Sequence, residues 1–94
     1  MTPDERIQDL NLILPGPIKL PPNVEINFSW VRVRGNRVFV SGHIALNTDG
    51  SVYDVLGKVG AQVTIEQGYE VARQIGLTML GSLKRELGTL NNIT

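Results

Sequence analysis

Apolar side chains recur at three- and four-residue steps between residues 65 and 87, which is the spacing of one face of an α-helix. The preceding "TIEQ" has the form of a capping box, in which the Thr64 hydroxyl accepts a hydrogen bond from a free backbone N–H and Gln67 reaches back. Gly88 is suited to end the helix. The expected apolar face consists of Ile65, Tyr69, Ala72, Ile75, Gly76, Met79, Leu80, Leu83 and Leu87.

Period-two patterns upstream predict strands. Residues 10–14 alternate before Pro15 and predict a short strand, and residues 27–34 predict a second. Gly35-Asn36 then predicts a two-residue hairpin turn into "VFVSGHIAL", residues 38–46, which we expect to be a buried strand. Its first three residues are apolar on both faces, which favours cover on both sides, from a helix and from another subunit.

The remaining segments complete one domain, residues 1–94. The charged start, residues 2–10, predicts one or two helical turns, and the proline-rich residues 15–22 predict a connecting loop. Residues 47–50 predict a turn, and residues 51–63 predict irregular structure. One long helix lying across a small antiparallel sheet is an α+β arrangement.

Composition narrows the function classes. The chain is 41% hydrophobic and 19% charged, as in soluble globular proteins, and no apolar run approaches the length of a membrane helix. Nine basic and nine acidic side chains cancel, so nucleic-acid binding is not expected, although Arg32, Arg34 and Arg37 form a local basic cluster. With no cysteine and no apolar signal segment, a cytoplasmic location is the expectation.

Few residues offer chemistry on their own. Ser41 and His43, the single histidine, would lie about 6.5–7 Å apart on one face of a strand, which argues against direct activation of the serine. One histidine with scattered carboxylates predicts no metal site. Gly57 and Gly60 favour a glycine-rich turn over a phosphate-binding loop, because no helix starts directly after them. We therefore expect neither a metal nor a cofactor.

Two charged pairs have simple interpretations. Glu66 and Glu70 lie one helical turn apart on the polar face, so a solvated surface explains them better than acid–base catalysis. Arg32 and Arg34 alternate with valines, where an exposed strand face is favoured over a carboxylate-binding role.

Several segments together resemble the YjgF/RidA family, also labelled endoribonuclease L-PSP. These are "VFVSGHIAL" followed by "DGSVYDVLGKVGAQVTIEQGYEVARQIGLTMLGSLKRELG", and the likeness covers most of residues 1–90. The chain is most similar to the branch with "VSGH", "GKVG" and "EQGYEAAR". The resemblance implies a chorismate-mutase-like α+β fold and a homotrimer with inner sheets, outer helices and ligand clefts between subunits.

The resemblance also implies an activity. Well-described members hydrolyse reactive 2-imino or 2-enamino acids to 2-oxo acids and ammonia, while some relatives are described as ribonucleases or translation inhibitors. Ser41 and Gly42 match the family's "SG", which lies against the ligand. Phe28 stands where deaminases carry tyrosine, so an aromatic wall remains without its hydroxyl, and His43 stands where many have glutamine. The implied substrate-binding residues are thus Phe28, Ser41, Gly42 and His43.

One departure from the family pattern shapes the expectation. Members continue past "LG" with further strands and a helix that supply a carboxylate-gripping arginine and a water-activating glutamate. The sequence predicts a truncated member that lacks this C-terminal third and does not hydrolyse imines alone. The alternatives are a non-catalytic module for metabolite binding or assembly, and a shortened gene product without independent function.

Overall fold

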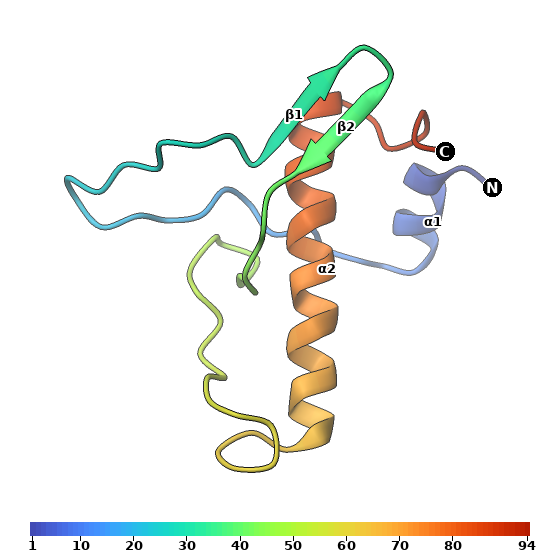
Figure 1. Ribbon diagram of the computed structural model, residues 1–94. Helices are drawn as coiled ribbons and strands as arrows, with labels where there is room; N and C mark the ends of the chain where they lie inside the picture. The colour runs from blue at the N-terminus through green and yellow to red at the C-terminus, as the bar shows by residue number, and fades with distance from the viewer.

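The β1–β2 hairpin lies over the C-terminal end of the long helix α2, while irregular segments extend to either side (Figure 1). This computed structural model describes residues 1–94. The elements in chain order are α1 (Pro3–Asp9), β1 (Val31–Arg34), β2 (Arg37–Val40) and α2 (Ile65–Leu87). The predicted α+β class is confirmed, with a sheet of two antiparallel strands.

Both ends of α2 lie where the sequence predicts them. The Thr64 hydroxyl accepts from the Gln67 N–H at 3.1 Å, and the Gln67 side-chain oxygen accepts from the Thr64 N–H at 2.9 Å. At the other end Gly88 has φ 80° and donates its N–H to the Lys84 carbonyl. The capping box and the glycine therefore set the limits of this 23-residue helix.

The face of α2 that packs against the chain differs from the predicted one. Toward the N-terminal end, Ile65 and Tyr69 are 75% and 72% exposed, although both belong to the predicted apolar face. Ile75 and Leu83 are only half-buried. The buried residues are instead Leu77, Thr78, Gly81 and Ser82.

Irregular backbone explains this shift, because the segments that cross α2 carry polar groups that need partners. The Leu46 N–H donates to the Thr78 hydroxyl at 3.2 Å, and the Leu46 carbonyl accepts from the Gln74 amide at 2.6 Å. The Pro15 carbonyl accepts from the Arg85 guanidinium at 3.0 Å. Polar side chains of α2 thus meet the crossing backbone, and the buried face is not the large apolar one that was predicted.

The hairpin has the register expected of a two-residue turn. Val31 pairs with Val40, Arg32 with Phe39, and Arg34 with Arg37. Gly35 has φ 60° while Asn36 has a negative φ, and positive φ at the first central position alone is the pattern of a type II′ turn. Alternation places four valines on one face, Val31, Val33, Val38 and Val40, and places Arg32, Arg34, Arg37 and Phe39 on the other.

Both strands are shorter than predicted. β1 starts at Val31, and β2 ends at Val40, so residues 41–45 of the predicted strand are irregular. The Ser41 N–H still donates to the Trp30 carbonyl at 2.9 Å. Further along the chain, Leu46 forms an isolated β-bridge with Val52. Every residue of β2 is exposed in the single chain, so the helix alone does not bury this strand, and cover by another subunit stays a prediction.

The predicted strand at residues 10–14 is absent. Asn11 adopts a left-handed φ of 54°, and the Leu12 N–H donates to the Ile7 carbonyl at 3.0 Å. These residues therefore close the end of α1, because no neighbouring strand offers them a ladder of hydrogen bonds.

Contacts near the two chain ends join α1 to the segment after α2 (Figure 1). The Asp4 carboxylate accepts hydrogen bonds from the Thr89 hydroxyl at 2.5 Å and from the Leu90 N–H at 3.1 Å. These bonds lower the pKa of Asp4, the Thr89 bond having the larger effect. The predicted N-terminal helical turns are confirmed by α1.

The core is small. Only 11 of 94 residues are buried, and the apolar ones among them are Val31, Ala45, Leu46, Val63, Leu77 and Leu90. Val31, Ala45 and Leu46 come from the hairpin and the segment after it, and Leu77 from α2, whereas Val63 precedes the start of α2 and Leu90 follows its end, where it bonds Asp4 of α1. Neither helix combines the length and the apolar composition that a membrane span requires.

Candidate functional site

Two of the predicted site residues, Phe28 and Ser41, line one surface depression. Its volume is about 420 Å³. It lies where the segment before β1 meets the end of β2, because antiparallel pairing brings Arg32 opposite Phe39. The lining residues are Asn27, Phe28, Ser29, Arg32, Phe39, Val40 and Ser41.

Arg32 supplies positive charge to this depression. Its guanidinium donates to the Ser29 hydroxyl at 3.3 Å. The one ion pair of the structure joins Lys19 to Asp49, so Arg32 has no carboxylate partner. A guanidinium with free N–H groups beside two phenylalanine rings can hold a small carboxylate and its hydrocarbon part. The alternation of Arg32 with valines predicted only a plain exposed strand face, because alternation alone does not show which side chains meet.

The Ser41 hydroxyl is engaged by the backbone. It donates to the Ser29 carbonyl at 2.7 Å, which leaves its oxygen able to accept a hydrogen bond. Gly42 is exposed and lies outside the lining of the depression. A side-chain carbon at Gly42 would meet nothing within 4 Å, so no close contact in this chain requires glycine there.

His43 faces away from the depression toward α2. Its Nδ1 lies 2.7 Å from the Ser41 carbonyl oxygen, and its Nε2 lies 2.9 Å from Ser82 Oγ. The imidazole thus contacts the backbone of Ser41 and the hydroxyl of a different serine. Ser82 was not predicted from the sequence, because it follows His43 by 39 residues and no local motif marks it.

Trp30 joins these two regions. Its ring centroid lies 4.8 Å from that of Phe28, edge to face, and 4.9 Å from that of His43. A second cavity of about 290 Å³ opens on the Ser82 side. Both cavities share Phe28 and Ser29, and the second is lined by Phe28, Ser29, Trp30, Val31, Ser82, Arg85 and Glu86.

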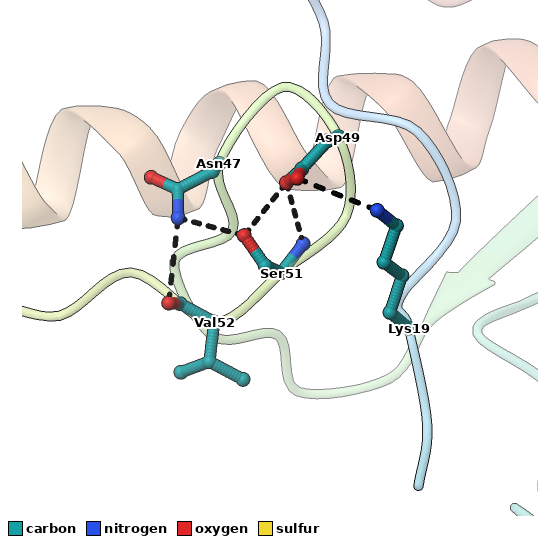
Figure 2. Close-up of polar contacts among 5 residues, drawn as sticks. All are labelled: Lys19, Asn47, Asp49, Ser51 and Val52. Atoms are coloured by element: carbon teal, nitrogen blue, oxygen red, sulfur yellow. Dashed lines mark hydrogen bonds and ion pairs between the residues drawn. The ribbon is translucent and has the colours of Figure 1, made fainter.

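The predicted turn at 47–50 is a separate polar cluster (Figure 2). Asp49 accepts from the Ser51 hydroxyl at 2.6 Å and from the Ser51 N–H at 3.0 Å. These bonds, with a smaller contribution from Lys19 at 3.4 Å, lower the pKa of Asp49 to about 2. Because these bonds hold the turn together and tie it to Lys19 of the proline-rich segment, we assign this cluster a structural role.

No group of three or more histidine, cysteine, aspartate or glutamate side chains gathers in the fold as a metal site would require. A comparison with family models finds no match, and comparisons with curated proteins and with solved structures find none either. The YjgF/RidA resemblance therefore remains a hypothesis, and the geometry of the two cavities is the basis for assigning function.

Proposed function

We propose that this chain is a RidA-like protein that binds small 2-imino or 2-oxo acids in the depression around Phe28, Arg32 and Ser41. The observation that carries the proposal is the unpaired Arg32 guanidinium beside Phe28 and Phe39, next to the "SGH" segment. The "SG" resemblance supports the same location. His43 and Gly42 border this region without lining it.

The chemistry of the ligand matches the lining. A carboxylate can accept two N–H bonds from Arg32, and a short carbon chain can pack on the phenylalanine rings. Because the Ser41 hydroxyl donates to the Ser29 carbonyl, its oxygen can accept from a protonated imine nitrogen. These three contacts distinguish a 2-imino acid from a simple amine or an uncharged ketone.

Hydrolysis is the reaction we assign on the basis of the resemblance. Water adds to the imine carbon, a proton moves to nitrogen, and ammonia leaves to give the 2-oxo acid. The seven lining residues include no carboxylate or imidazole. The proton transfers would then rely on solvent or on a second subunit of the proposed homotrimer, whose cleft would close over the depression.

A second candidate follows from that same observation. A site that has a cation, aromatic walls and no acid–base group can bind a metabolite without turning it over. The alternative is therefore a non-catalytic binding module for the same ligand class.

The test of ligand binding is calorimetric titration with pyruvate, a stable 2-oxo acid. Arg32→Ala should weaken binding at least tenfold, since a hydrogen bond to a charged group contributes about 1.5–3 kcal/mol. Arg37→Ala is the matched control, because Arg37 lies on the same face of the hairpin but outside the depression. Equal affinity of wild type and Arg32→Ala for pyruvate would show that the depression is not the binding site.

Turnover separates the two candidates. Purified protein is mixed with a freshly generated 2-imino acid, and its decay is followed against buffer. Faster decay that Arg32→Ala abolishes supports the deaminase. Pyruvate binding with decay no faster than buffer favours the binding module.

A further inference from the structure

Ser82 lines the second cavity, and its Oγ lies 2.9 Å from Nε2 of His43, whose ring is not part of that lining. The Ser41 carbonyl oxygen lies 2.7 Å from the other ring nitrogen. We propose that Ser82 is a nucleophile activated by His43, and that this cavity supports acyl transfer from small esters. This proposal goes beyond the assigned imine chemistry and uses neither Arg32 nor the Ser41 hydroxyl.

The hydrogen bonds fix the direction of proton transfer. A carbonyl oxygen only accepts, so the neutral imidazole of His43 must carry its proton on Nδ1. Nε2 is then the acceptor, and the Ser82 hydroxyl donates to it. The Ser41 carbonyl thereby orients the ring as the acid of a serine–histidine–acid triad does.

The Ser82 hydroxyl differs from another hydroxyl on the same helix. Thr78 donates to the Gln74 carbonyl one turn earlier at 2.9 Å, which is the usual arrangement for a hydroxyl within a helix. Ser82 instead contacts His43 and the Arg85 guanidinium, the latter at 3.3 Å. Its proton is thus directed to a base rather than to the helix backbone.

Arg85 is placed to stabilise negative charge beside this nucleophile. One of its nitrogens donates to the Pro15 carbonyl at 3.0 Å, which holds the guanidinium while another reaches Ser82 Oγ. A fixed cation next to the reacting oxygen favours the oxyanion of a tetrahedral intermediate.

The cavity sets the substrate class. Ser82 itself is only 6% exposed, yet it lines a space of about 290 Å³ whose walls include the exposed Phe28. This volume admits a short acyl group, with the Trp30 and Phe28 rings as an apolar wall. Esters with a short acyl chain therefore fit best.

The reaction balances with these groups alone. Ser82 Oγ attacks the ester carbonyl carbon while its proton passes to His43 Nε2, and that proton then goes to the departing alkoxide. Water, deprotonated by His43, attacks the acyl-serine, and collapse releases the carboxylic acid and restores Ser82. Each half-reaction breaks one acyl–oxygen bond and forms another.

The experiment treats the full chain with an alkyl fluorophosphonate and follows hydrolysis of p-nitrophenyl acetate. We expect a single adduct that peptide mass spectrometry places on Ser82, and none in Ser82→Ala. His43→Gln should slow ester hydrolysis about 100-fold, the lower range for removal of a general base. The control is Ser51→Ala, which removes a serine hydroxyl bonded to Asp49 in the separate turn and should change neither signal.

Further outcomes are also decisive. If Ser82→Ala fails to fold by circular dichroism, mapping of the adduct on native and heat-denatured wild type takes its place. An adduct on Ser82 that forms only in the native protein supports the proposal. No adduct, an adduct elsewhere, or equal labelling after denaturation overturns it.

Discussion

Pro15 lies against Gly81 where the loop crosses α2. Pro15 is almost completely buried, and a side-chain carbon at Gly81 would lie 2.7 Å from the Pro15 carbonyl oxygen. Backbone atoms cannot withdraw as a flexible side chain can. Glycine is needed at position 81 because there is no room for a side chain, and not because of its backbone conformation.

Gly81→Ala should therefore lower the free energy of unfolding by about 1–3 kcal/mol, which is typical of overpacking. Gly76→Ala is the matched control on the same helix, because a side-chain carbon there meets nothing within 4 Å. Alanine at 76 should raise stability by up to about 1 kcal/mol through helix propensity. Urea denaturation measures the free energy of unfolding of both variants. Equal stability of Gly81→Ala and wild type would mean that the loop at Pro15 can move away from α2 at little cost.

Asp49 makes stability depend on acid pH. Its pKa falls from 3.8 to about 2 on folding, so its bonds to Ser51 stabilise the fold above about pH 3.8. That contribution is lost as the pH falls toward 2. We expect Asp49→Asn to lower the thermal midpoint at neutral pH and to flatten its decline over this acid range.

Circular dichroism melts at several pH values test this expectation. Asp54→Asn, which neutralises a neighbouring carboxylate of the same loop, should retain the steeper decline. A decline in Asp49→Asn as steep as in wild type would contradict the role of the Ser51 bonds.

Sequence patterns predicted the candidate site only in part at this scale. Phe28 and Ser41 do share a depression. The Ser41 hydroxyl bonds the Ser29 carbonyl, but residues 41–45 are irregular, so the strand spacing assumed for Ser41 and His43 does not apply. Ser82 and Arg85 were missed because Ser82 meets His43, and Arg85 meets Pro15, only through tertiary packing. No spacing along the chain encodes that meeting.

Among the elements, α2 shows which part of a helix is locally encoded. Its ends depend on Thr64, Gln67 and Gly88, all within a few residues of the boundary, so sequence located them. The packed face depends on segments from elsewhere in the chain, so periodicity misplaced it. The lengths of the strands were overestimated for the same reason. A strand needs a hydrogen-bonding partner along its whole length, and that partner comes from another part of the chain.

Leu77→Ala and Ile65→Ala distinguish the two possible faces. Leu77 is 8% exposed and its truncation should cost about 2–5 kcal/mol. Ile65 is 75% exposed, and its truncation in a single chain should change stability by no more than about 0.5 kcal/mol. Guanidinium denaturation gives both values, and a reversed order would restore the face predicted from periodicity.

At the scale of the whole molecule, the small core leaves much apolar surface exposed. β2 carries Val38, Phe39 and Val40, which are 37%, 55% and 41% exposed, along a strand with one free edge. A free edge with apolar side chains favours association. These features support the proposed homotrimer, in which β2 would be covered.

Sedimentation equilibrium tests this assembly. We expect a species of three times the 10.3 kDa chain mass, and a thermal midpoint that rises with protein concentration. A monomer at every concentration, with a constant midpoint, would contradict the homotrimer and leave the depression to act within one chain.

Trp30 gives the molecule an internal optical reporter. It is the only tryptophan, is half-buried, and borders both Phe28 and His43. Its emission maximum depends on contact with water, so a molecule that enters the cavity beside Ser82 would shift it toward the blue. Occupancy could then be followed on the unmodified chain, without attaching a dye.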